Sequence, residues 1–148
     1  MKIGKAKAAF KPITVQLGII VRDLEKAMQD YSALLSIGPW ETFDVREMNC
    51  RAATAMLGTI EVELIQPLVD ESTLRKLFGD DEASFNHVGF YIDDQDAEIA
   101  RFEELGVQFL HKKAGKDLGC ESSLMNLRGR AGANFELLYR HPKRSMKK

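Results

Sequence analysis

The chain has few of the residues that support a disulfide-stabilised or membrane-spanning protein. It contains two cysteines in 148 residues, Cys50 and Cys120, which are too few and too far apart for a disulfide framework or a thiolate zinc site. No stretch approaches the roughly 20 apolar residues of a transmembrane helix. The lysine-rich start, Met1–Lys11, lacks the apolar run of a signal peptide. We therefore expect a cytoplasmic protein with two buried free thiols.

The chain also lacks an excess of charge of either sign. Its formal net charge is −1 at pH 7 and its pI is near 6.3, so no overall field attracts nucleic acid or an anionic membrane. Apolar residues make up 45% of the sequence, enough for a core in a chain of one domain's length. We therefore expect a single globular domain over residues 1–148, with neither nucleic acid nor a membrane as partner.

Two stretches of the sequence have the same layout. TVQLGIIVRD begins at residue 14 and FNHVGFYIDD at residue 85, and placing His87 on Gln16 requires an offset of 87 − 16 = 71. A similar shift places NFELL, near the C-terminus, on EVELI, so that Glu136 falls on Glu63 with an offset of 136 − 63 = 73. Self-similarity over this length indicates an internal repeat.

Hydrophobic periodicity predicts the same order of elements in both halves. Alternating apolar residues indicate strands, and apolar residues three or four apart indicate helices that begin at Asp23 and Asp94. Each half therefore has the order βαβββ, over about residues 13–67 and 85–140, which predicts an α+β fold with an eight-stranded, partly closed sheet around a metal cleft. The predicted strands are Ile13–Val21, Trp40–Val45, Cys50–Leu57, Ile60–Gln66, His87–Ile92, Val107–His111, Gly119–Leu127 and Ala133–Tyr139, with a short linking helix Ser72–Phe78 capped by Ser72.

Four polar side chains lie at equivalent places of the two halves. Each half has one on its first strand and a Glu on its fourth, at spacings of 63 − 16 = 47 and 136 − 87 = 49. If the halves pack about a pseudo-twofold axis, these strands converge on one cavity. Three oxygens and one imidazole suit a divalent metal, with two positions of a six-coordinate ion left open. The predicted ligands are Gln16, Glu63, His87 and Glu136, and the ion is Zn, Co, Ni or Mn.

The chain resembles the vicinal oxygen chelate superfamily, which includes glyoxalase I, methylmalonyl-CoA epimerase, ring-cleaving dioxygenases and bleomycin resistance proteins. The resemblance covers roughly Ile13 to Tyr139 and is carried by VRDLEKAMQDYSALLSIGPW, VELIQPLVDEST, HVGFYIDD and NFELL. The segment VELIQPLVDEST is similar to the corresponding segment of methylmalonyl-CoA epimerases. The family's metal positions fall on the four predicted ligands. Epimerases usually have His where this chain has Gln16, and the set Gln, Glu, His, Glu is similar to that of eukaryotic zinc glyoxalase I.

This resemblance implies removal of a proton α to a carbonyl or thioester, as in an isomerase or epimerase. A metal with open positions stabilises the resulting negative charge, and Glu136 resembles the glutamate that is both ligand and base in these families. Epimerisation needs a second acid or base, which in epimerases can be a Glu on the third strand. That strand offers no Glu here, so Glu61 and Glu121 are the substitute catalytic candidates.

Other functions of the superfamily are alternatives. A glyoxalase I-like lactoylglutathione lyase would need Arg and Asn groups for glutathione, yet the matching positions are Ile20, Pro67 and Ala83. A non-enzymatic binder, similar to bleomycin resistance proteins, would need no metal. We expect a small-molecule substrate, an acyl-CoA being one candidate, and a homodimer. The basic groups available for a phosphate-bearing tail are Arg22, Arg51, Lys112, Lys113, Lys116, Arg128 and Arg130.

Overall fold

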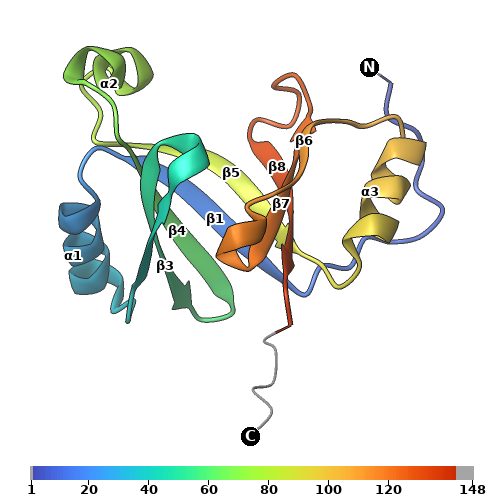
Figure 1. Ribbon diagram of the computed structural model, residues 1–148, viewed down its shortest axis with the longest axis horizontal. Helices are drawn as coiled ribbons and strands as arrows, with labels where there is room; N and C mark the ends of the chain where they lie inside the picture. The colour runs from blue at the N-terminus through green and yellow to red at the C-terminus, as the bar shows by residue number, and fades with distance from the viewer. Residues whose placement is uncertain (1, 143–148) are drawn as a thin grey trace, which may run out of the picture. The chain divides into compact units, whose positions relative to one another are not determined.

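The structure is a computed structural model, and it describes residues 2–142. Eight strands and three α-helices form the fold (Figure 1). Hydrogen-bonded neighbours in the sheet follow the order β2-β3-β4-β1-β5-β8-β7-β6. The elements β1-α1-β2-β3-β4 and β5-α3-β6-β7-β8 each make one βαβββ module, with α2 between them. The prediction of an α+β fold with two such modules and eight strands is confirmed.

The chain divides into two compact units that we describe separately. The first unit is Thr14–Gly89, and the second comprises the described parts of Met1–Ile13 and Phe90–Lys148. The strand β5 (Ala83–Tyr91) runs from the first unit into the second. None of the helices within residues 2–142 combines the length and the apolar character needed to cross a membrane.

The first unit packs one helix on one side of its strands. Parallel pairing joins β1 (Thr14–Val21) to β4 (Ile60–Pro67), and antiparallel pairing continues through β3 (Cys50–Leu57) to β2 (Glu41–Val45). The helix α1 (Leu24–Leu35) lies against β3 and β4. The core beneath it consists of Val21, Leu24, Ile37, Ala53, Ala55, Val62 and Leu64.

Local chemistry sets the ends of α1. The Asp23 carboxylate accepts a hydrogen bond from the Lys26 amide at 3.0 Å, which satisfies one of the free N–H groups of the first turn. Ser36 ends the helix in the left-handed conformation, with φ 53°, and its amide donates to the Ser32 carbonyl. Leu24 is fully buried at the start of the helix, and burying such a side chain contributes about 1.5–3 kcal/mol.

The helix α2 (Glu71–Phe78) begins at a different residue from the one expected. Its N-cap is Asp70, whose carboxylate accepts from the Thr73 amide at 2.8 Å. Ser72, the expected cap, lies inside the helix. An acceptor carboxylate two positions earlier captures the first-turn amides, so the helix starts before Ser72.

The second unit has the same order of elements as the first. Its helix α3 (Gln95–Glu104) is capped by Asp94 and lies on β8 (Asn134–Arg140), which pairs with β7 (Cys120–Asn126) and then β6 (Gln108–Ala114). The apolar core consists of Ile92, Ile99, Val107, Met125, Leu127 and Leu137. Four of the eight strands extend beyond their predicted ends: β4 reaches Pro67, β5 starts at Ala83, β6 reaches Ala114 and β8 reaches Arg140.

The N-terminal segment covers the second unit. Phe10 contacts Phe90 and Phe102 edge to face, with ring centroids 5.3 and 5.4 Å apart. The Arg101 guanidinium lies over the Phe10 ring and donates to the Ala8 carbonyl at 2.9 Å. Phe10, from this lysine-rich segment, therefore packs against the unit's core.

Candidate metal centre

Three of the four predicted metal ligands meet in the first unit. The parallel register pairs Gln16 with Glu61 and Gly18 with Glu63, so the Gln16 and Glu63 side chains leave the same side of the sheet. His87, on β5, has its Nε2 atom 2.9 Å from Gln16 Oε1 and 3.4 Å from Glu63 Oε2. The three groups come from three strands and are separated by up to 71 residues in sequence.

These separations fit a shared coordination shell. Two ligand atoms about 2.1 Å from one ion lie about 3.0 Å apart at a right angle and about 3.4 Å apart at the tetrahedral angle. Gln16 is 4% exposed and His87 is 2% exposed, so water does not satisfy these groups from outside. The donor set and its spacing therefore fit a divalent ion.

Hydrogen bonds behind the ligands orient them. The Gln16 amide nitrogen donates to Glu61 Oε1 at 2.7 Å, which turns its oxygen toward His87. The Asn86 amide oxygen lies 3.0 Å from His87 Nδ1, which fits the tautomer in which Nδ1 donates to Asn86 and Nε2 presents its lone pair. A lone pair facing two oxygens is unfavourable unless a cation lies among them. A divalent metal ion would be such a cation.

A glycine makes room for the imidazole. A Cβ built on Gly18 would lie 2.0 Å from His87 Cε1 and 2.2 Å from Nδ1, far inside van der Waals contact. The ring therefore lies directly over the backbone of β1. Gly18 was visible in the sequence as a repeated residue, yet its role depends on a ring from another strand.

The remaining predicted residues have other surroundings. Glu136 is half-buried on β8 of the second unit, opposite Leu124. Glu121 is buried in the same unit, 2.7 Å from His141 Nε2, and accepts from the Gln95 amide at 2.9 Å. Within residues 2–142, no group of three His, Cys, Asp or Glu side chains is placed to hold a metal, because the third donor beside His87 and Glu63 is an amide.

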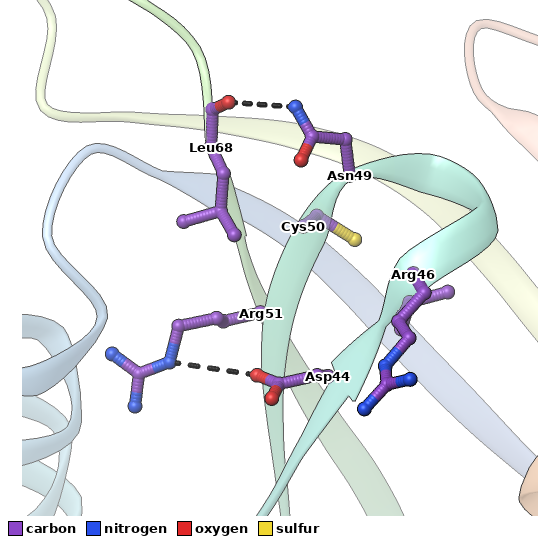
Figure 2. Close-up of a pocket in the computed structure, with 7 residues that line it drawn as sticks. Asp44, Arg46, Asn49, Cys50, Arg51 and Leu68 are labelled. Carbon is purple, nitrogen blue, oxygen red and sulfur yellow. Dashed lines mark hydrogen bonds and ion pairs between the residues drawn. The ribbon is translucent and has the colours of Figure 1, made fainter.

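A surface hollow of about 470 Å³ lies at the ends of β2, β3 and β4 (Figure 2). Arg51 points toward Asp44 across it at 3.8 Å and also pairs with Glu25 at 3.1 Å. Burial, and then the Glu63 carboxylate, raise the pKa of the Cys50 thiol above its ordinary value. Sequence reasoning did not anticipate this hollow. It is lined by Asp44, Val45, Arg46, Asn49, Cys50, Arg51 and Leu68.

Arg22, one of the candidate phosphate-binding groups, has a structural role. Its guanidinium donates to the carbonyls of Asp81 and Gly79 at 2.9 and 2.6 Å and pairs with Glu71 at 2.9 Å. It also lies over the Phe78 ring. These contacts attach α2 and the segment after it to the end of β1, so Arg22 is occupied.

Residues 15–121 match the Glyoxalase/Bleomycin resistance protein/Dioxygenase superfamily, and the chain belongs to that superfamily. This membership agrees with the repeated βαβββ modules and with the resemblance expected from the sequence. No curated protein sequence matches the chain.

Solved structures with this fold include several epimerases. The methylmalonyl-CoA epimerase from Mycobacterium tuberculosis has a TM-score of 0.75 and 20% identity, over 86% of this chain and 87% of that one. A selenomethionine methylmalonyl-CoA epimerase has a TM-score of 0.77 and 22% identity, over 92% and 100%. The Streptomyces coelicolor enzyme in complex with 2-nitronate-propionyl-CoA has a TM-score of 0.75 and 20% identity, over 90% and 100%. At these identities the likeness establishes the fold alone.

Proposed function

We propose that this protein is a metal-dependent isomerase or epimerase that removes a proton α to a carbonyl or thioester. The observation that carries the proposal is the convergence of Gln16 Oε1, Glu63 Oε2 and His87 Nε2, with separations that suit one divalent ion. Membership of the superfamily and the epimerase fold of its structural neighbours support it. The site is proposed to contain Glu136 as the fourth ligand.

The proposed chemistry divides between the ion and the chain. A bound divalent ion supplies Lewis acidity, which lowers the energy of negative charge developing on a carbonyl oxygen. Gln16, Glu63 and His87 would hold the ion, and Asn86 would keep the His87 ring in the tautomer whose Nε2 lone pair can bind it. Glu136 accepts the α-proton and returns it, and this role requires a carboxylate rather than an amide.

A second proton carrier is needed if the configuration at the α-carbon is inverted. The register places Glu41, Thr54 and Glu63 in one row on the same side of the sheet. Glu41 is exposed at the edge strand, so it is the carboxylate that we add to Glu61 and Glu121 as a candidate. The contacts of Glu61 with Gln16 and of Glu121 with His141 favour supporting roles for those two.

The proposed substrate is an acyl-CoA thioester, and the proposed assembly is a homodimer. One of the solved neighbours is a methylmalonyl-CoA epimerase in complex with methylmalonyl-CoA and NH4+, with 21% identity and a TM-score of 0.74. Arg51, Lys112 and Lys113 are the basic groups that we propose to test for phosphate contacts, although each is paired with a carboxylate.

The function is tested by metal content and by proton exchange. We expect about one divalent ion per chain by elemental analysis, and loss of the α-proton of an acyl-CoA thioester in heavy water. A chelator should stop the exchange and lower the melting temperature, because a ligand bound only by the folded state stabilises it. His87→Ala is the matched loss-of-site variant.

The alternatives give different results in the same experiments. Absence of bound metal, with an unchanged melting curve in excess chelator, would contradict the proposal and favour a bleomycin-resistance-like binder. Bound metal with turnover of the hemithioacetal of glutathione and methylglyoxal, and no acyl-CoA exchange, would instead support a lactoylglutathione lyase. The Gln, Glu, His, Glu composition of the proposed ligand set is what keeps that second enzyme under consideration.

A further inference from the structure

A chain of buried polar contacts leads away from the proposed metal ligands. Glu61 Oε1 accepts from Gln16 Nε2 at 2.7 Å, and Gln16 Oε1 lies 2.9 Å from His87 Nε2. Glu61, Gln16 and His87 are 7%, 4% and 2% exposed. Groups held this deeply in hydrogen-bonded contact have few alternative arrangements. The Glu61 carboxylate is therefore part of the site's construction.

The direction of the Gln16 amide decides whether it can bind a metal. Its oxygen has lone pairs, whereas its NH₂ group only donates hydrogen bonds. Rotating the amide by half a turn would present NH₂ toward His87 and remove one ligand atom. The two arrangements have nearly the same shape, so packing alone does not choose between them.

The Glu61 carboxylate determines the direction of the Gln16 amide. An ionised carboxylate accepts hydrogen bonds and cannot donate one, so only the NH₂ end of Gln16 can face it. The opposite end, the oxygen, then points at His87. The equivalent residue of the second module, His87, is oriented differently, through Asn86 beside it in sequence. Two amino acids at equivalent positions of the repeat thus need two different orienting groups.

We propose that Glu61 is a positioning residue that holds the Gln16 amide with its oxygen toward the metal position. This inference depends on the proposed metal-dependent function. Glu61 then acts by orienting Gln16 and does not itself transfer a proton. Mutating a residue that orients a metal ligand typically lowers metal affinity by about 10–100-fold. We expect the loss of the Glu61 contact to lower it by a factor in that range.

Two conservative variants weaken the contact between Glu61 and Gln16 in different ways. Glu61→Asp keeps the negative charge but withdraws the carboxylate by one methylene, so it should lower the affinity for Co²⁺ or Zn²⁺ by about 10–100-fold. Glu61→Gln keeps the length of the side chain but can present either an oxygen or an NH₂ group to Gln16, so it no longer excludes the wrong amide direction and should also lower the affinity. Affinity is measured by competition with a chromophoric chelator. Glu47→Gln and Glu47→Asp, at an exposed position, are the matched controls and should change nothing.

A second background tests the mechanism directly. Gln16→Glu places an oxygen at both ends of the side chain, so its orientation no longer matters. In that background Glu61→Asp should cost no affinity, because Glu61 then repels the new carboxylate instead of orienting an amide, giving a large coupling term in the double-mutant cycle. An equal loss from Glu61→Asp in both backgrounds would overturn the positioning role. Wild-type affinity in both Glu61→Asp and Glu61→Gln would overturn it too.

A measurement on metal-free protein separates this inference from the proposed function. The two side-chain amide protons of Gln16 should be shifted from free-amide positions and protected from exchange in ¹⁵N-labelled wild type, and should resemble a free amide in Glu61→Asp. A free-amide signature already in wild type would overturn the inference. Failure of wild type to bind any divalent ion would overturn the proposed function, and the amide spectrum would still decide whether Glu61 orients Gln16.

Discussion

The two modules have the same backbone hydrogen bonding at the 3₁₀ turn that precedes β3 in one and β7 in the other, but different side chains lie beside that turn. In the first, the Leu68 amide donates to the Asn49 carbonyl at 2.8 Å, and in the second the His141 amide donates to the Gly119 carbonyl at 2.9 Å. Asn49 and Gly119 both adopt the left-handed conformation after a short 3₁₀ turn. The repeat therefore extends to the details of the chain turns.

The side chains beside this turn form a polar cluster in the second module and border a hollow in the first. In the second module the His141 ring contacts Tyr139 and pairs with the buried Glu121 carboxylate at 2.7 Å. In the first module the corresponding positions are Leu68 and Arg51, and a hollow of about 470 Å³ lies beside them. Equivalent backbones can therefore carry a closed polar cluster in one module and an accessible surface in the other.

The largest expected effect distinguishes the equivalent glutamates of the two modules. Glu136→Gln should keep an oxygen near the metal position yet lose about 10²–10⁴-fold in α-proton exchange, because an amide cannot accept the proton. Exchange rates per bound metal, measured in heavy water, check this. Glu63→Gln is the control, expected to weaken metal binding with a smaller effect per bound metal. Wild-type exchange in metal-loaded Glu136→Gln would place the base elsewhere, with Glu41, Glu61 and Glu121 next to test.

The next effect concerns the glycine under the His87 ring. Gly18→Ala should lower the free energy of unfolding by about 1–3 kcal/mol through overpacking and weaken metal binding, because the new methyl group displaces the imidazole. Urea denaturation and metal competition measure both quantities. Gly4→Ala is the control, since its Cβ would have its nearest neighbour at 3.7 Å. Unchanged metal affinity in Gly18→Ala would show that the ring position is not needed.

The helix caps test whether the modules are locally equivalent. Asp23 and Asp94 each accept a first-turn amide at 3.0 Å, so Asp23→Ala and Asp94→Ala should each lower the free energy of unfolding by about 1 kcal/mol. Asp30→Ala, within α1, is the control and should cost nothing, because alanine is the better helix former. A clear difference between the two caps would mean that tertiary packing compensates for one of them.

The smallest expected effect concerns the two cysteines. Burial, and secondarily Glu63, raise the pKa of the Cys50 thiol above the ordinary value of 9.0. The thiol's contribution to stability is therefore complete below about pH 9 and declines as the pH rises through the higher folded-state pKa. In a Cys120→Ala background, modification of Cys50 between pH 8 and 10 should be much slower in folded than in unfolded protein. Glu63→Gln should lower the pKa and speed modification, and an unchanged rate would contradict that influence.

Much of the fold followed from local patterns in the sequence. Alternation located the strands to within a few residues, and Asp23 and Asp94 were correctly expected to cap their helices. Ser72 was wrong as a cap because Asp70 is a stronger acceptor for the first-turn amides of α2. Both cysteines are free as expected, with Cys50 buried and Cys120 only half-buried. The assignments that succeeded depend on interactions within a few residues of chain.

Local sequence patterns specify the repeated βαβββ order and the positions of the polar residues within it, because periodicity and capping are short-range properties. Tertiary structure is needed to place the His87 ring over Gly18 and the Glu61 carboxylate against the Gln16 amide. It also determines that Arg22 holds α2 in place. These contacts join residues that are 45 to 71 positions apart in the sequence and are brought together by strand pairing. Their partners are chosen by strand register and by the space left around each side chain, and neither quantity is present in a local sequence pattern.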